Sequence, residues 1–183
     1  IEVTKNNHVT SVLLNRPDAM NAITPEMHHE LQSAFDDFAS DSDQLVAVIR
    51  GAGERAFCAG SDLKNIAAGG FKAYPKSGYA GLIERFDLNK PLIAAVDGFA
   101  LGGGFEVALA CDIIIASNRS SFGLPEPLVG AVALGGGVHR LARQIGLKQA
   151  MGMVLTADSV SAEEGFRMGF VTQIVEPDAL DGT

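Results

Sequence analysis

Two glutamates in unlike surroundings carry the clearest chemical signal of this sequence. Glu106 follows three consecutive glycines in GGGFEVALACD, a segment that is otherwise apolar up to its last residue. Burying an unpaired carboxylate is costly, so this glutamate is either a tolerated accident or a group with a chemical task. Glu126 lies 20 residues later, between two prolines and two leucines in LPEPLVG. Two carboxyl groups in unlike settings suit the roles of general base and general acid.

A helix that begins at the glycines would place Glu106 beside backbone donors. Residues three apart share a helix face, and helical side chains lean toward the N-terminus, so Glu106 and the Gly103 amide are expected to face the same spot. Free amides at a helix N-terminus stabilise a developing oxyanion, and glycine keeps a Cβ out of the path of a substrate. The helix N-terminus is also expected to keep Glu106 ionised.

The surroundings of Glu126 allow two interpretations. The simpler one is a loop carboxylate in solvent. The other is a general acid, because the two prolines fix the backbone and the flanking leucines raise the pKa of the carboxyl.

Three successive units of strand, short strand and helix position these residues. They read LVAVIRG, AFCAG and SDLKNI; then PLIAAVDG, FALGG and GFEVALA; then DIIIAS, SSFGL and GGGVHRLARQIG. The pattern predicts a coiled stack of β-β-α turns around a shared core, with the helices outside the sheets, in one α/β domain over residues 1–183. Asp62 is expected to cap the first of these helices.

The flanking segments follow the same local rules. VTSVLLN predicts a strand, and Thr24 with Pro25 predicts the start of a helix that buries Met27, Leu31, Ala34, Phe35 and Phe38. Ser161 and Glu164 predict a capping box, Gly169 the end of that helix, and VTQIV a returning strand. The glycine-rich segment 69–81 is expected to be a mobile loop that covers a site.

Composition excludes several classes of protein. A net charge of −8, from 14 Lys and Arg against 22 Asp and Glu, disfavours nucleic-acid binding. Two cysteines in 183 residues favour a reducing compartment, which is the cytoplasm, or the mitochondrial matrix in a eukaryote. No apolar run is long enough to span a membrane, and the first residues do not resemble a signal peptide.

Other motifs have simple structural interpretations. GAGERA matches a loose dinucleotide fingerprint, but no helix follows it, so it is interpreted as a glycine turn. His8, His28, His29 and His139 have no metal-ligand spacing and are expected in solvent, and no metal site is expected. Cys58 is interpreted as a packing residue.

The ordered blocks LNRPDAMNAI, AFCAGSDLK, KPLIAAVDGFALGGGFEVALACD, SFGLPEPLVG and SAEEGFRMGFVTQIV resemble the enoyl-CoA hydratase/isomerase family, also called the crotonase superfamily, over essentially the whole chain. The resemblance implies a β-β-α spiral core, homotrimers or homohexamers, and acyl-CoA thioesters as substrates. Coenzyme A would then arrive as part of the substrate, with no permanently bound cofactor. Part of the central region is also similar to carnitinyl-CoA dehydratases, which implies a branched or polar acyl group.

The same resemblance implies a role for each site residue. The Ser61 and Gly103 amides would form the oxyanion hole, Glu106 would be the base on water, and Glu126 the acid for the α-carbon. Serine replaces the alanine common in hydratases at position 61, which matters little for a backbone donor. Ala59, Asp62 and Lys64 fall in the region expected to bind coenzyme A.

The paired glutamates favour hydration of a 2-enoyl-CoA over two alternatives, which are an isomerase that uses one glutamate and a non-catalytic acyl-CoA-binding subunit. The RNA-binding branch of the family is disfavoured, because PEMHHELQSAFDDFASD contains no lysine. Family members continue beyond the position of Thr183 into helices that cover the acyl pocket and build the trimer. That C-terminal helical segment is expected to be absent here.

Overall fold

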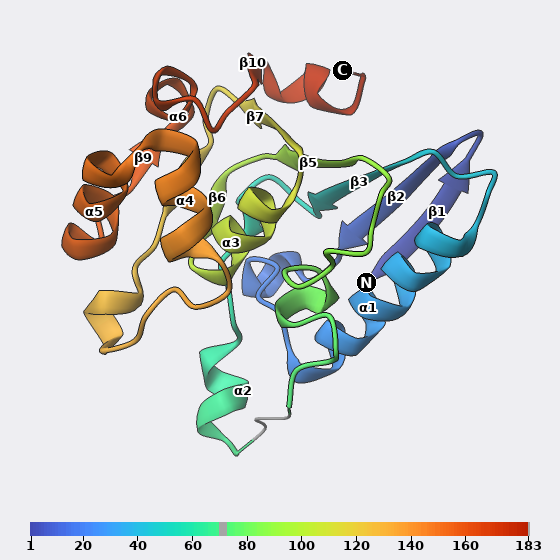
Figure 1. The fold of residues 1–183 in the computed structure, drawn as a ribbon, viewed down its shortest axis with the longest axis horizontal. Helices are drawn as coiled ribbons and strands as arrows, with labels where there is room; N and C mark the ends of the chain where they lie inside the picture. Colours follow the sequence, from blue (N-terminus) through green and yellow to red (C-terminus); the bar gives the residue numbers. More distant parts are fainter. Residues whose placement is uncertain (70–72, 183) are drawn as a thin grey trace.

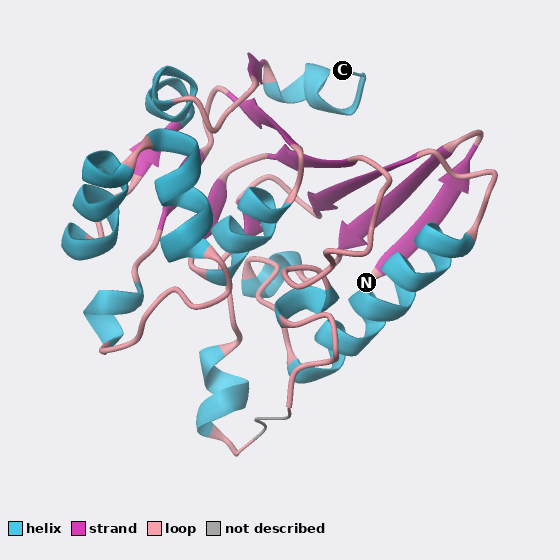
Figure 2. Cartoon of the chain, viewed as in Figure 1, coloured by secondary structure: helices cyan, strands magenta, loops and turns pink. Residues whose placement is uncertain are grey.

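The computed structural model describes residues 1–69 and 73–182. Two sheets form the framework (Figures 1 and 2). The larger has the strand order β1-β2-β3-β5-β7-β10 and the smaller the order β4-β6-β8-β9. The strands are β1 (Glu2–Asn6), β2 (Val9–Leu14), β3 (Val46–Gly51), β4 (Ala56–Cys58), β5 (Leu92–Val96), β6 (Phe99–Leu101), β7 (Ile113–Ser117), β8 (Ser121–Gly123), β9 (Val160–Ser161) and β10 (Gln173–Val175).

The three predicted β-β-α units are confirmed. Strands β3, β5 and β7 are parallel neighbours in the larger sheet, and β4, β6 and β8 are parallel neighbours in the smaller one. The units end in α2 (Leu63–Ala67), α3 (Gly103–Ala110) and α4 (Gly137–Ile145), the last after the 3-10 turn η3 (Glu126–Val129). Each turn of the chain therefore adds one strand to each sheet, which produces the spiral.

The N-terminal region adds a hairpin and a long helix. Strand β1 pairs antiparallel with β2, and none of its side chains is buried, so no hydrophobic alternation marks it in the sequence. After the turn η1 (Pro17–Ala19), helix α1 (Pro25–Ser40) begins at Thr24, whose side chain accepts a hydrogen bond from the Met27 amide. The predicted apolar stripe of α1 is buried, as expected.

Helix α3 is the most enclosed helix that carries a predicted site residue. All residues from Gly103 to Leu109 are buried. The Phe105 ring packs against Phe122 and Phe170, with centroid distances of 5.3 and 5.1 Å. Figure 1 shows α3 near the centre of the molecule, next to α4. Its polar groups are therefore held in a rigid, largely apolar environment.

The C-terminal third is helical. Helix α5 (Leu147–Thr156) follows α4, and α6 (Ala162–Met168) has the predicted capping box of Ser161 and Glu164 and ends at Gly169 in the left-handed region. Strand β10 then joins β7, and the turn η4 (Pro177–Gly182) follows. Within the described parts of the chain, no helix combines the length and the apolar character needed to cross a membrane.

Two expectations require correction. His28 is buried, with 5% of its surface exposed, because α1 packs against the segment around the turn η2 (Tyr79–Gly81) as well as against the core. The segment 69–81 is not a free loop throughout, since Tyr79 and Ala80 are buried. Residues 70–72 of that segment lie outside the described residues.

Candidate active site

Glu106 lies in the first turn of α3 with 4% of its surface exposed. Its Oε1 accepts a hydrogen bond of 2.9 Å from the amide of Gly137, the first residue of α4. Gly135 faces the same carboxylate so closely that a Cβ there would overlap with it. The loop before α4 therefore forms a backbone cradle for this carboxyl group.

The pKa of Glu106 is raised, opposite to the effect expected from the helix N-terminus. Burial raises the pKa of Glu106 to about 7, and the nearby charge of Glu126 adds to the increase. The Gly137 hydrogen bond opposes this increase but does not cancel it. Desolvation outweighs the favourable helix N-terminus because the carboxyl group is almost completely enclosed.

Glu126 begins the 3-10 turn η3 and is half-buried, which excludes the simple solvent-loop interpretation. Its Oε1 approaches Gly102 so closely that a Cβ on Gly102 would be 3.1 Å away. Its Oε2 is buried without a hydrogen-bond partner among the described residues. Burial raises the pKa of Glu126, as the sequence predicted. A carboxyl with an unpartnered oxygen and a raised pKa is suited to hold a proton.

Ser61 and Gly103 lie next to each other although 42 residues separate them in the chain. A Cβ on Gly60 would be 3.1 Å from the Gly103 nitrogen, which places the backbone before Ser61 against the start of α3. The Gly60 carbonyl and the Asp62 amide bond to Ile23, so the Ser61 amide lies between two bonded positions. Neither the Ser61 nor the Gly103 amide donates to another described residue. Both amides are therefore available to donate to a ligand.

Tyr79 and His28 complete the surroundings of this pair and were not predicted. The Ser61 hydroxyl donates a hydrogen bond of 3.2 Å to the Tyr79 hydroxyl. The His28 ring contacts the rings of Tyr79 and Tyr74 edge to face, with centroids 4.6 and 4.9 Å away. Both tyrosines of the chain lie in the segment 74–79, and this concentration was the one sequence signal for them.

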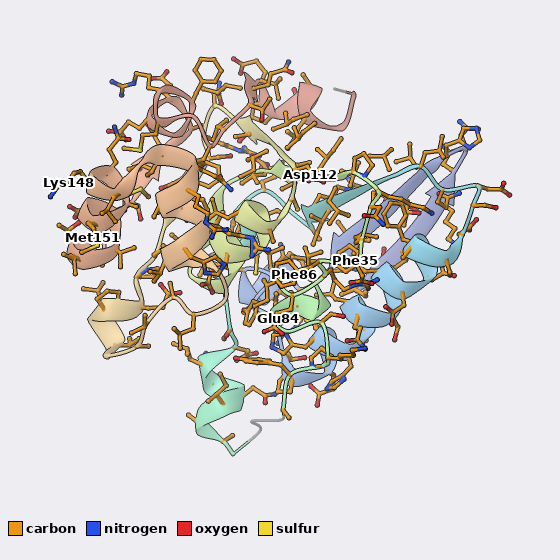
Figure 3. The ribbon with its side chains drawn as sticks, in the orientation of Figure 1. Phe35, Glu84, Phe86, Asp112, Lys148 and Met151 are labelled. Atoms are coloured by element: carbon orange, nitrogen blue, oxygen red, sulfur yellow. The ribbon has the colours of Figure 1, made fainter. Side chains whose placement is uncertain are left out.

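The segment that carries Tyr79 lies between two helices. The turn η2 contacts both α1 and α3. Figure 3 shows the side chains after η2, where Glu84 and Phe86 are labelled, over the middle of the molecule. Arg140 of α4 donates to the Ile83 carbonyl at 3.0 Å, which ties this segment to the helix that cradles Glu106.

The residues expected to bind coenzyme A lie around the start of α2. The Asp62 side chain caps α2 by accepting from the Asn65 amide, and its other oxygen pairs with Arg16 at 3.0 Å. Lys64 is exposed and Ala59 is half-buried. Asp62 is therefore already engaged in holding α2, whereas the Lys64 ammonium is accessible. In residues 1–69 and 73–182, no cluster of three His, Cys, Asp or Glu side chains is placed to hold a metal ion.

The chain is similar to a large set of known proteins. A family model described as enoyl-CoA hydratase/isomerase matches residues 4–183. The chain is 43% identical over 182 residues to the carnitinyl-CoA dehydratase of Proteus mirabilis, covering 98% of this chain and 69% of that protein. It is also 43% identical to the (E)-benzylidenesuccinyl-CoA hydratase of Thauera aromatica, covering 95% of this chain and 69% of that protein.

Solved structures give the same result for the fold. A carnitinyl-CoA dehydratase from Mycobacterium avium matches with a TM-score of 0.94 and 38% identity, over 99% of this chain and 72% of that one. An enoyl-CoA hydratase from Mycobacterium tuberculosis matches with a TM-score of 0.93 and 39% identity, over 99% and 71% of the two chains. The spiral fold expected from the sequence is therefore confirmed.

Proposed function

Because the chain belongs to the enoyl-CoA hydratase/isomerase family, we propose that it adds water reversibly across the 2,3 double bond of a 2-enoyl-CoA thioester. The observation that carries this proposal is the pair of carboxyl groups Glu106 and Glu126. Both are withdrawn from solvent, and both have raised pKa values. A relative that moves a double bond would need only one of them.

In the proposed reaction, the free amides of Ser61 and Gly103 donate to the thioester oxygen. This polarises the conjugated system and stabilises the enolate that forms when water attacks the β-carbon. The glycine at position 103 leaves room for the Tyr79 hydroxyl, which a Cβ there would overlap. Negative charge that develops on the thioester oxygen is thereby held by groups that are already oriented.

Proton transfer is assigned to the two glutamates. The ionised Glu106 carboxylate takes a proton from the attacking water, and a pKa of about 7 suits a base that works near neutral pH. The protonated Glu126 carboxyl gives its proton to the α-carbon as the enolate collapses. One proton is taken and one is given, so the product is the 3-hydroxyacyl thioester, and exchange with solvent restores the two carboxyl groups.

The proposals for the substrate and the assembly rest on the same family membership. We propose that coenzyme A enters as part of the thioester, with Ala59 and Lys64 near its nucleotide end and Asp62 holding α2 in place. We also propose a homotrimer or homohexamer, which is supported by exposed apolar side chains on η3, the following loop and α5. These are Leu128, Val129, Val132, Leu134, Leu147 and Leu155. Light scattering measures the assembly directly.

The reaction is tested with two classes of substrate. A hydratase given a 2-enoyl-CoA removes the absorbance of the conjugated thioester and yields the 3-hydroxy product. An isomerase given a 3-enoyl-CoA creates that absorbance instead. A panel of acyl groups that includes carnitinyl-CoA, motivated by the name of the Proteus relative, then defines the preferred substrate. A protein that binds these thioesters without converting any of them would contradict the proposal.

A further inference from the structure

The hydroxyl group of Tyr79 is buried at the start of α3. The Tyr79 side chain has 5% of its surface exposed. Its hydroxyl oxygen lies so close to Gly103 that a Cβ on this glycine would overlap with it, and it accepts the 3.2 Å hydrogen bond from Ser61 Oγ. This oxygen is therefore adjacent to both residues whose amides form the proposed oxyanion site.

The proton of this hydroxyl has no acceptor in the described parts of the chain. Tyr79 accepts in its bond with Ser61, so its own O–H remains available to donate. A buried hydroxyl donor without an acceptor is costly, which points to an acceptor that arrives with a ligand. Burial, with smaller contributions that include the charge of Glu106, raises the pKa of Tyr79 well above its ordinary value. The hydroxyl therefore stays protonated.

We infer that Tyr79 is a third hydrogen-bond donor to the thioester oxygen, beside the Ser61 and Gly103 amides, and that the Ser61 hydroxyl positions it. This inference rests on the proposed function. Three donors that have no acceptor among the described residues match an oxygen atom that gains negative charge in the transition state. The Ser61 hydroxyl, by donating to the phenol oxygen, also strengthens the phenol as a donor.

The Tyr79 ring is held in place by its neighbours. His28 contacts it edge to face at 4.6 Å, and Tyr74 does so at 5.7 Å. The Ala80 amide donates to His28 Nδ1 at 2.9 Å, which fixes the histidine ring. A phenylalanine at position 79 keeps these ring contacts, so Tyr79→Phe removes the donor without removing the packing.

The kinetic test compares the wild type with Tyr79→Phe in the hydration of a 2-enoyl-CoA. We expect kcat to fall about 10- to 100-fold with little change in KM, because the donor acts mainly on charge that develops in the transition state. Ser61→Ala, which keeps the amide, is expected to lower kcat by a smaller factor. In the Tyr79→Phe background, Ser61→Ala should cause no further loss, since its hydroxyl acts through the phenol. Ser33→Ala removes an exposed hydroxyl from α1 and serves as the control.

A spectroscopic test reports on the thioester oxygen itself. A 2-enoyl-CoA labelled with heavy carbon at its carbonyl is bound to Glu106→Gln, with and without Tyr79→Phe, and the infrared carbonyl stretch is recorded. Hydrogen bonds lower the frequency of this stretch, so Tyr79→Phe is expected to raise it. A merely structural role of the tyrosine would leave the frequency unchanged.

The outcomes separate the inference from the proposed function. A wild type that binds 2-enoyl-CoA without hydrating it contradicts the proposed function, while the carbonyl frequency still reports on Tyr79. An active wild type whose Tyr79→Phe variant keeps both kcat and the carbonyl frequency overturns the inference. A fall in the kcat of Tyr79→Phe that occurs only with substrates carrying polar acyl groups, with an unchanged carbonyl frequency, also overturns the inference. The hydroxyl would then bind the acyl chain and not the thioester oxygen.

Discussion

Glu106 Oε1 accepts a hydrogen bond from the Gly137 amide at 2.9 Å, which fastens the central helix α3 to the start of α4. The two residues are 31 positions apart in the chain. The contact requires a glycine at position 135, because a Cβ there would overlap with the same carboxylate. The orientation of the proposed base is therefore set by the loop that precedes α4.

Gly135→Ala is predicted to displace the Glu106 carboxylate. The backbone at Gly135 is not left-handed, and the three atoms nearest to a Cβ there all belong to the Glu106 carboxylate. We expect turnover to fall about 10- to 100-fold, as for a misplaced catalytic group. Gly152→Ala in α5 is the matched control, since a Cβ there meets nothing within 4 Å. The control should keep full activity, and a Gly135→Ala variant with the kcat of the wild type would refute the cradle.

Glu106→Gln and Glu126→Gln are each predicted to lower turnover by about 100-fold or more, while thioester binding survives. Glutamine keeps the shape of the side chain and removes proton transfer. If both groups act on one water and one substrate, the double variant loses little more than the worse single one. Glu163→Gln, on the exposed side of α6, is the control. If the protein were an isomerase, Glu106→Gln would hardly change the rate of double-bond migration.

The rate of hydration is predicted to follow a bell-shaped pH profile. Glu106 must be ionised and Glu126 must be protonated, so kcat/KM rises through the lower and falls through the higher apparent pKa of the pair. Burial raises the pKa of Glu106 to about 7 and also raises that of Glu126, so one limb is expected near pH 7. Steady-state rates across pH measure both limbs, and Glu106→Gln should remove the limb near pH 7 from the residual activity. A rate that does not change around pH 7 would be inconsistent with the assignment of Glu106.

His28 is predicted to make folding sensitive to acid. Burial lowers the pKa of His28 to about 4, from 6.5 in an unfolded chain. As the pH falls, the unfolded state therefore binds the proton before the folded state does. The contribution of His28 to the free energy of unfolding is complete above about pH 6.5. It declines by about 2–3 kcal/mol as the pH falls toward 4. His28→Asn keeps an acceptor for the Ala80 amide but cannot take up this proton.

Denaturant unfolding of the two proteins at neutral and acid pH measures this effect. His28→Asn should be less stable than the wild type at neutral pH, because the ring contacts are lost, but its stability should change less with pH. His139→Asn, at an exposed position of α4, should keep the pH dependence of the wild type. An unchanged pH dependence in His28→Asn would show that His28 is not the responsible group.

Local features of this fold are readable from the sequence, whereas contacts between distant segments are not. The Thr24 and Ser161 caps, the strands of the spiral and the buried Glu106 follow from short patterns. The burial of His28 does not, because it depends on the segment 73–81 folding over α1. Strand β1 has no buried side chain to mark it, and its place depends on pairing with β2.

In the candidate site, too, local features could be predicted from the sequence and contacts between distant segments could not. Glu106, Glu126, Ser61 and Gly103 were identified from their neighbours in sequence and from the family resemblance. The Gly135 and Gly137 cradle was not, since nothing local links these glycines to a carboxylate about 30 residues earlier. The raised pKa of Glu106 was not expected for the same reason, because enclosure by α4 and its loop causes the desolvation.

Hydration in water enriched in heavy oxygen tests the proposed reaction most directly. The wild type is incubated with a 2-enoyl-CoA, and the product is analysed by mass spectrometry. Addition of water predicts a 3-hydroxyacyl-CoA that carries one heavy oxygen atom at the β-carbon, formed at a rate that falls about 100-fold or more in both Glu106→Gln and Glu126→Gln. A product without heavy oxygen, or incorporation that persists at the wild-type rate in both variants, would contradict the two-glutamate hydration.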